Sequence, residues 1–188
     1  MIGYCFCGSF CTVGKSVNIL RSLAAEGNDI LPVMSETVYE TDTRFGKAED
    51  IKKTVCEICG KNIIHTVAEA EPIGPSLKLD MLVISPCTGN TLAKMANGIT
   101  DTAVTMAAKA QLRSNRPVVI ALATNDALSA NLGNIGTLLS RKNIYFVPLF
   151  QDDTEKKPSS LICDFSRLKE TMVSAFAGRQ LQPVFLQK

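Results

Sequence analysis

The sequence contains no tryptophan and only one histidine, His65, among its 188 residues. A lone histidine is more often structural than catalytic. The net charge of +2 is too small to favour nucleic acid or an anionic membrane. No apolar run approaches the roughly 20 residues of a membrane-spanning helix, and the opening MIGYCFCGSF lacks the basic start of a signal peptide. We therefore expect a cytoplasmic protein that binds neither nucleic acid nor membranes.

Cysteine, by contrast, is abundant, with seven residues. An odd number of cysteines without an export signal argues against a disulfide framework. The pair Cys56-x-x-Cys59 has the spacing of zinc ligands, but no second such pair exists. Two residues three apart also share one face of a helix. We expect no metal site, with zinc at this pair as the alternative.

Short apolar stretches alternate with longer helical patterns. The stretches are nearly continuous in apolar residues, which is typical of strands covered on both faces; they span 2–7, 29–35, 80–85, 117–123 and 143–148. Helical patterns span 13–24, 91–99, 101–113, 126–142 and 161–178. The alternation predicts an α/β fold with a doubly wound, Rossmann-like parallel sheet and helices on both faces. We expect one domain, with its α/β unit in 1–150 and a linker, final helix and tail in 151–188 packed on it.

The segment GSFCTVGKS, residues 8–16, ends like the phosphate-binding loop G-x-x-x-x-G-K-[ST]. The first glycine of that motif would fall on Ser9, but the glycine is Gly8, so the loop is one residue too long. Both residues follow the first predicted strand, where N–H groups at the start of a helix can bind phosphate. Hydroxyl groups suited to a monophosphate come from Ser9, Thr12, Ser35 and Thr37. Capping of the first helix would equally explain Thr12.

The segment ISPCTGNTLAKMANGITDTAV, residues 84–104, resembles the signature P-A-S-A-N-T…K-x-A-N-G-x-x-D of the flavin-containing cysteine decarboxylase family of flavoproteins. The matching residues are Pro86, Asn90, Thr91, Lys94, Ala96, Asn97, Gly98 and Asp101, and the departures are Cys87, Thr88 and Gly89. The resemblance implies FMN, with its phosphate near Gly8, Ser9 and Ser35 and its isoalloxazine near the loop after Pro86. The implied cofactor-binding residues are Gly8, Ser9, Ser35, Thr37, Pro86, Cys87, Thr88, Asn90 and Asn125.

Two elements of the decarboxylases in this family are missing. Their catalytic histidine would fall within residues 70–80, which contain none, and their P-x-M-N element retains only Asn125. Other segments resemble the family of dipicolinate synthase B subunits; they are TDTRFG (41–46), EAEPIGP (69–75), TNDALS (124–129), KNIYFVPLFQDD (142–153) and QLQPV (180–184). This resemblance implies oxidation of a dihydrodipicolinate-type ring to dipicolinate in the mother cell of a sporulating bacterium. The implied partner is the nucleotide-binding A subunit of dipicolinate synthase, which would carry NAD(P).

A substrate with two carboxylates needs bidentate or backbone donors. Arg44, expected in the loop between the second strand and the next helix, is the candidate for pairing with a carboxylate, and a solvated charge is the alternative. Asn90 is the second catalytic candidate, as a donor to a carboxylate or to a flavin carbonyl. The alternative for Asn90 is a turn residue that holds its own backbone.

The resemblance also implies a homo-oligomer. Small residues that allow helices to approach closely are Ala93, Ala96, Gly98, Ala107 and Ala108, although packing of a helix on the sheet would explain them too. Two further functions stay open at this point. One is an FMN-dependent decarboxylase of a cysteine-type substrate that uses another base, and the other is a non-catalytic partner that only completes the nucleotide-binding subunit.

Overall fold

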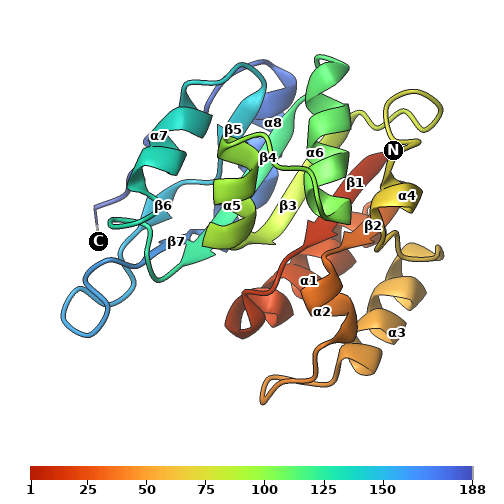
Figure 1. Cartoon of the computed structure of the whole chain (residues 1–188), viewed down its shortest axis with the longest axis horizontal. Coiled ribbons are helices and arrows are strands. Elements are labelled where there is room, and N and C mark those ends of the chain that lie inside the picture. The colour runs from red at the N-terminus through yellow and green to blue at the C-terminus, as the bar shows by residue number, and fades with distance from the viewer. Residues whose placement is uncertain (188) are drawn as a thin grey trace.

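The computed structural model describes residues 1–187 and shows a twisted sheet between two layers of helices (Figure 1). The strands are β1 (Ile2–Phe6), β2 (Ile30–Met34), β3 (Met81–Cys87), β4 (Val118–Thr124), β5 (Ile144–Phe146), β6 (Leu149–Phe150) and β7 (Leu161–Cys163). The helices are α1 (Phe10–Ala25), α2 (Glu36–Glu40), α3 (Ala48–Cys59), α4 (Val67–Ala70), α5 (Gly89–Ala96), α6 (Ala103–Arg113), α7 (Leu132–Leu139) and α8 (Leu168–Phe176), with a 3₁₀ turn at Phe165–Arg167.

The sheet has the order β2-β1-β3-β4-β7-β6, and β5 also pairs with β4. Strands β1 to β5 run parallel to one another, which confirms the doubly wound α/β arrangement. Strands β6 and β7 pair in antiparallel fashion, so the sheet is mixed, with a parallel main part. Strand β7 pairs with the last residues of β4, Ala123 and Thr124, and therefore extends one side of the sheet at the carboxyl ends of the parallel strands.

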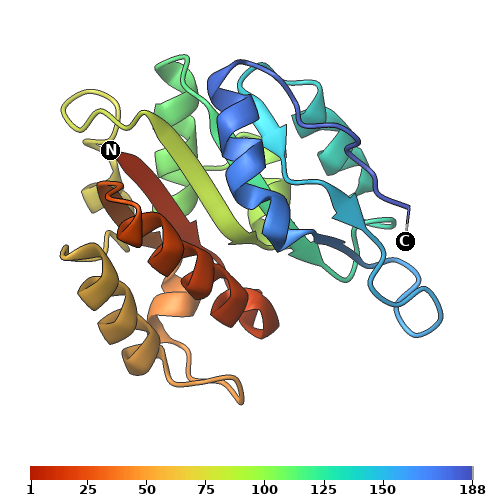
Figure 2. The same cartoon turned by 180° about the vertical axis from the view of Figure 1, so that it is seen from behind.

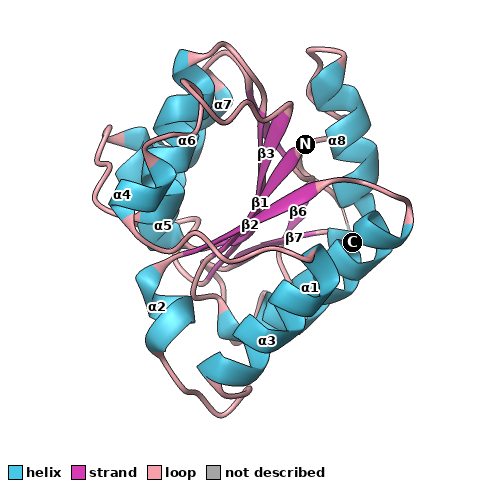
Figure 3. Ribbon diagram, turned by 90° about the vertical axis from the view of Figure 1, so that its right-hand side faces the viewer, coloured by secondary structure: helices cyan, strands magenta, loops and turns pink. Residues whose placement is uncertain are grey.

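Helices α4 to α7 cover one face of the sheet, and α1, α3 and α8 cover the other, as Figures 2 and 3 show. Every residue of β1, β2 and β3 is buried. This two-sided cover is why the strands are continuous in apolar residues and do not alternate with polar ones.

Buried hydroxyl groups join α1 to the centre of the sheet. The Tyr4 hydroxyl contacts Ser16 Oγ at 2.9 Å, and Ser16 Oγ donates to Ser85 Oγ at 3.0 Å. Burial raises the pKa of Tyr4 well above its usual value, so the phenol stays neutral. Satisfied buried polar groups of this kind fix how a helix sits on a sheet.

The C-terminal helix predicted for 161–178 is shorter than expected, because its first three residues form β7. The Asp164 side chain then accepts a hydrogen bond from Ser166 N at 3.1 Å and begins a new helical turn. The helix predicted for 126–142 is likewise confined to α7, which starts after a turn that ends at Asn131. In both segments the apolar residues keep a helical spacing. The chain nevertheless forms a strand in the first segment and a turn in the second.

None of the helices within residues 1–187 is long and apolar enough to cross a membrane. Cys56 and Cys59 both lie on α3 and are half-buried, and burial raises the pKa of the Cys59 thiol to about 11. Across residues 1–187 no group of three or more histidine, cysteine or acidic side chains is arranged to hold a metal ion.

Candidate functional site

Polar residues follow the parallel strands at one edge of the sheet. The chain leaves β1 at Gly8, β2 at Ser35, β3 at Thr88 and β4 at Asn125. Strand order reverses between β1 and β3, which are adjacent although the chain passes through β2 between them. Ligands of doubly wound sheets bind at such a reversal, outside the carboxyl ends of the strands. The structure thus brings together residues that the sequence placed at four separate strand ends.

The first hollow at this edge, the small cavity, has a volume of about 310 Å³. It is lined by Gly8, Ser35, Glu36, Thr37, Thr88, Asn90, Thr91, Lys94 and Thr102. Ser35 precedes α2 but makes no capping hydrogen bond with its side chain. This residue is only 8% exposed, and its Oγ is buried without a partner in the described part of the chain. A buried hydroxyl with no partner carries a desolvation cost that a ligand oxygen would remove.

Gly8 lines the small cavity between the end of β1 and α2. A β-carbon added to Gly8 would lie 3.1 Å from Thr37 Cγ2, so a larger residue would push against α2. Glycine therefore keeps the backbone of this turn open toward a ligand.

The far wall of the small cavity is the first half of α5. Thr88 caps this helix by accepting a hydrogen bond from Thr91 N at 3.2 Å. Lys94 Nζ lies 2.9 Å from both carboxylate oxygens of Asp101, and this hydrogen bond, with the charge of the lysine, holds the pKa of Asp101 below its usual value. Asn90 is exposed at this wall, so its amide is accessible from the cavity.

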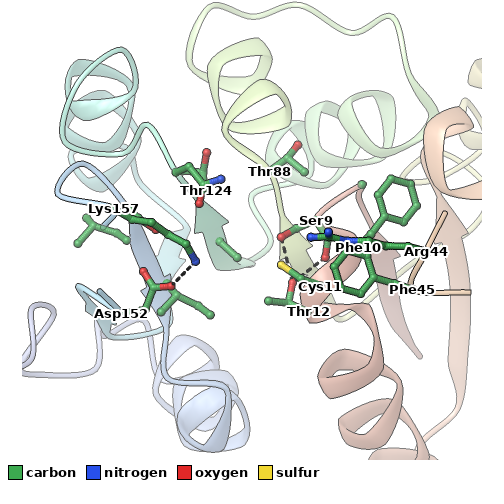
Figure 4. Close-up of a pocket in the computed structure, with 16 residues that line it drawn as sticks. Ser9, Phe10, Cys11, Thr12, Arg44, Phe45, Thr88, Thr124, Asp152 and Lys157 are labelled. Atoms are coloured by element: carbon green, nitrogen blue, oxygen red, sulfur yellow. Dashed lines mark hydrogen bonds and ion pairs between the residues drawn. The ribbon is translucent and has the colours of Figure 1, made fainter. Parts of the chain in front are cut away.

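A second hollow, the large cavity, has a volume of about 510 Å³ and shares Gly8 and Thr88 with the small one. Its other lining residues are Ser9, Phe10, Cys11, Thr12, Arg44, Phe45, Ala123, Thr124, Asn125, Asp152, Lys157, Ser160, Leu161 and Ile162. Figure 4 shows the start of α1 and the Arg44–Phe45 loop on one side and Thr124 with the Asp152–Lys157 loop on the other. The Arg44 guanidinium lies 4.8 Å from the centroid of the Phe45 ring.

The start of α1 differs in detail from the expectation. Ser9 is the residue that precedes the helix, and Thr12 lies inside the first turn, where its hydroxyl donates to Ser9 O at 2.8 Å. Thr12 is therefore not the cap. The first N–H groups of a helix have no partner within it, so this turn presents donors to the large cavity.

Two predicted cofactor residues lie away from both cavities. Pro86 and Cys87 are buried inside β3, and the Pro86 carbonyl accepts a hydrogen bond from Cys7 N at 3.1 Å. They shape the strand end but line neither cavity. The position of Arg44 also needs a correction, because α2 intervenes between β2 and its loop.

Sequence reasoning missed the loop from Gln151 to Ser160, which supplies Asp152 and Lys157. Burial acts to raise the pKa of Asp152, but hydrogen bonds from Ser160 and Lys157 outweigh it and hold the pKa below its usual value. The loop is polar and was expected to be a linker. If β7 had been recognised as a strand paired with β4, the loop that precedes it would have been placed at the carboxyl edge of the sheet.

The single histidine lines neither cavity. His65 stacks on Tyr39, with ring centroids 3.8 Å apart and planes 9° apart, and its Nδ1 lies 3.1 Å from Glu69 Oε2.

Cys7, the residue before Gly8, is a buried thiol. Burial raises the pKa of Cys7 to about 11, although hydrogen bonds from Thr91 and Thr88 act to lower it. Neither His65 nor Cys7 is placed to act as a base on a ligand in these cavities.

Comparison with known proteins agrees with this architecture. The sequence is 42% identical over 186 residues to the B subunit of dipicolinate synthase from Bacillus subtilis (strain 168), covering 99% of this chain and 93% of that protein. The crystal structure of the dipicolinate synthase B subunit from Bacillus halodurans C matches with a TM-score of 0.91 and 41% identity, over 100% of this chain and 96% of the other.

A more distant structure shares the fold alone. The FMN-dependent cysteine decarboxylase SpaF matches with a TM-score of 0.68 and 21% identity, over 93% of this chain and 95% of that chain. The family described as Flavoprotein matches residues 1–174 of this sequence. The family match covers most of the chain, and the similarity to the B subunit of dipicolinate synthase is nearly full-length. Both agree with a site at the point where strand order reverses, and the chain therefore belongs to the Flavoprotein family.

Proposed function

We propose that this chain binds FMN and serves as the B subunit of a dipicolinate synthase. With the A subunit of that enzyme, which carries NAD(P), it oxidises a dihydrodipicolinate-type precursor to pyridine-2,6-dicarboxylate in the mother-cell cytoplasm of a sporulating bacterium. The 42% identity to the Bacillus subtilis protein supports this reaction. Two adjoining cavities at the switch point support the division into a cofactor and a small substrate.

The observation that carries the cofactor assignment is the buried hydroxyl of Ser35, a residue that lines the small cavity, because this hydroxyl has no hydrogen-bond partner within residues 1–187. A phosphate oxygen accepts hydrogen bonds and would satisfy it. The Gly8 turn leaves backbone open beside it, and Lys94 adds a positive charge that Asp101 already positions. Donors at a helix start favour the same anion. These residues fit the phosphate group of FMN.

Bound FMN would supply the two-electron oxidation of the ring, so the protein mainly orients the substrate and sets its electrostatics. Arg44 binds one substrate carboxylate, because its planar guanidinium can donate two parallel hydrogen bonds. The adjacent Phe45 ring contacts that guanidinium by a cation–π interaction. Asn90 offers an amide donor at the wall near Thr88. If the precursor still carries a hydroxyl group, water leaves in the same conversion.

Absorbance titration with FMN tests the cofactor assignment. Ser9→Asp places a negative charge at the start of α1, next to Gly8, which lines both cavities; we expect this charge to repel the phosphate and abolish FMN binding. Asn18→Asp is the matched control, since it adds the same charge to an exposed position of the same helix, outside both cavities. Undiminished FMN affinity in Ser9→Asp would remove the phosphate assignment.

The distant match to a cysteine decarboxylase favours one alternative, decarboxylation of a cysteine-type substrate. That reaction would need a base other than His65, which stacks on Tyr39 and lines neither cavity. Release of carbon dioxide from such a substrate would support it. Protein that stays colourless when FMN is added would instead favour a non-catalytic partner of the nucleotide-binding subunit.

A further inference from the structure

The large cavity has a positive side chain on each of two facing walls. Arg44 lies on the wall formed by the start of α1 and the loop before α3, and Lys157 lies across the hollow beside Asp152 (Figure 4). Lys157 Nζ is 3.3 Å from Asp152 Oδ2. A single guanidinium can neutralise one carboxylate, so a doubly charged ligand in this hollow needs a second cation.

The ion pair of Lys157 is weak enough to be exchanged. The Lys157 side chain is 50% exposed and that of Asp152 is 28% exposed, and ion pairs in such positions contribute little to stability. Asp152 also interacts with the Ser160 side chain, so it keeps a hydrogen bond if the lysine turns to another carboxylate. The ion pair therefore keeps the Lys157 ammonium group beside the cavity and leaves it able to bind a ligand carboxylate.

The loop that carries Lys157 is folded rather than loose. Lys157 N donates to Asp153 O at 2.9 Å, and Gln151 Nε2 donates to Pro158 O at 2.9 Å. Leu128 N donates to Ser159 O at 2.9 Å and ties the loop to the segment after β4. A side chain on a braced loop loses less conformational freedom when it binds a ligand.

We propose that Lys157 is the second carboxylate-binding residue of the large cavity. It pairs with the carboxylate that Arg44 does not hold, and so selects dicarboxylates over monocarboxylates. The inference rests on the proposed function, because it takes the ligand to be a small aromatic dicarboxylate. It adds a specificity-determining residue from a loop that neither the sequence patterns nor the family resemblance assigned.

Calorimetric titration of the FMN-loaded full chain with two ligands tests this role. The ligands are pyridine-2,6-dicarboxylate and pyridine-2-carboxylate, which differ by one carboxylate. We expect the wild type to prefer the dicarboxylate by tenfold or more. Lys157→Gln should weaken dicarboxylate binding about tenfold and leave monocarboxylate binding unchanged.

Lys156→Gln is the matched control, because it removes the same charge from the neighbouring residue, which lines neither cavity. It should bind both ligands like the wild type. Asp152→Asn, which frees the lysine, should bind the dicarboxylate at least as tightly as the wild type. Unchanged thermal unfolding of each variant confirms that it is folded.

Two results would overturn the inference while leaving the proposed function intact. One is wild-type dicarboxylate affinity in Lys157→Gln, and the other is an equal loss for both ligands, which would indicate a general charge effect. A wild-type protein that binds FMN but neither pyridine ligand would overturn both the inference and the dicarboxylate substrate. The outcomes therefore separate the two failures.

Discussion

Arg44 is exposed at the large cavity, beside the Phe45 ring. We predict that Arg44→Lys keeps the fold and FMN but loses most dipicolinate-forming activity with the nucleotide-binding subunit. Lysine retains the charge but cannot reproduce the fork of two hydrogen bonds. A lost charge-assisted hydrogen bond of about 1.5–3 kcal/mol corresponds to a roughly ten- to hundredfold lower kcat/KM.

The control for this variant is Arg21→Lys, an exposed position of α1 outside both cavities. It should leave kcat/KM unchanged. Near-normal activity of Arg44→Lys at limiting substrate would show that Arg44 is only a surface charge.

The cysteines provide a second prediction, because they differ sharply in access. Cys11 is exposed in the first turn of α1 and lines the large cavity, whereas Cys5, Cys7, Cys87 and Cys163 are buried with pKa values raised by burial. Iodoacetamide should label Cys11 first, and the buried four should react only on unfolding, because the thiolate is the reactive form. Mass spectrometry of the alkylated peptides gives the order.

FMN or dicarboxylate bound at the site should slow Cys11 labelling by tenfold or more. Cys56 and Cys59 on α3 serve as the internal control, since they are half-buried outside both cavities. A Cys11 rate that does not change with saturating ligand would place the ligand elsewhere.

The cavity-lining residues that the sequence predicts include several that follow a strand, and Arg44 in a loop. Gly8, Ser35 and Thr88 could be predicted because parallel strands end at one edge. Cys87 was placed with them by its position in a motif, yet it is the last buried residue of its strand. Lys157 could not be found, because its place depends on strand pairing and not on its neighbours in the chain.

At the scale of elements, β7 shows why local patterns fail. Its three residues pair with β4 and β6, and β4 is more than thirty residues earlier in the printed sequence. Three residues are too few to show the two-residue period of a strand. The helix predicted from the spacing of apolar residues in α8 was therefore extended over β7 as well. The long parallel strands and α1 were predicted because their patterns last long enough to be distinctive.

Gly89, at the start of α5, packs so closely against the loop after β4 that a larger residue there should destabilise the fold. A β-carbon on Gly89 would lie 2.6 Å from Asn131 Nδ2, 2.6 Å from Thr124 Oγ1 and 2.7 Å from Asp126 Oδ1. These three side chains also bond one another, with Thr124 Oγ1 2.5 Å and Asn131 Nδ2 2.9 Å from the Asp126 carboxylate. Gly89→Ala should therefore lower the free energy of unfolding in urea by about 1–3 kcal/mol, as overpacking does.

The matched control is Gly133→Ala on α7, where an added β-carbon meets nothing within 4 Å. Alanine is the better helix former, so this variant should be neutral or more stable by up to about 1 kcal/mol. Gly89→Ala as stable as the control would mean that the loop yields easily. In that case Thr124 is not held firmly at the cavity wall.

The oligomeric state of the whole molecule remains a prediction. Ala107 and Ala108 are 0% and 1% exposed and pack inside the chain, so they do not support an interface. Ile99, next to Gly98, is 47% exposed on the side of α5 and α6. We expect a homo-oligomer by light scattering, and Ile99→Glu should weaken it if this side is the interface.

Val173→Glu is the control for that assembly test, because Val173 is 71% exposed on α8, on the other face of the sheet. It should leave the light-scattering mass unchanged. A wild-type monomer at micromolar concentration would contradict the prediction.

The antiparallel strand β7 has a consequence for how the protein is made. One wall of the large cavity includes Gly8–Thr12, and the facing wall includes Lys157 and residues 160–162. Synthesis runs from the N-terminus, and early segments begin to fold first. The turn at Gly8 can therefore take shape on the ribosome before the far wall has been translated. Under the proposed function, capture of a small dicarboxylate has to wait until β7 docks on β4, so we expect the nascent chain to meet its cofactor before its substrate.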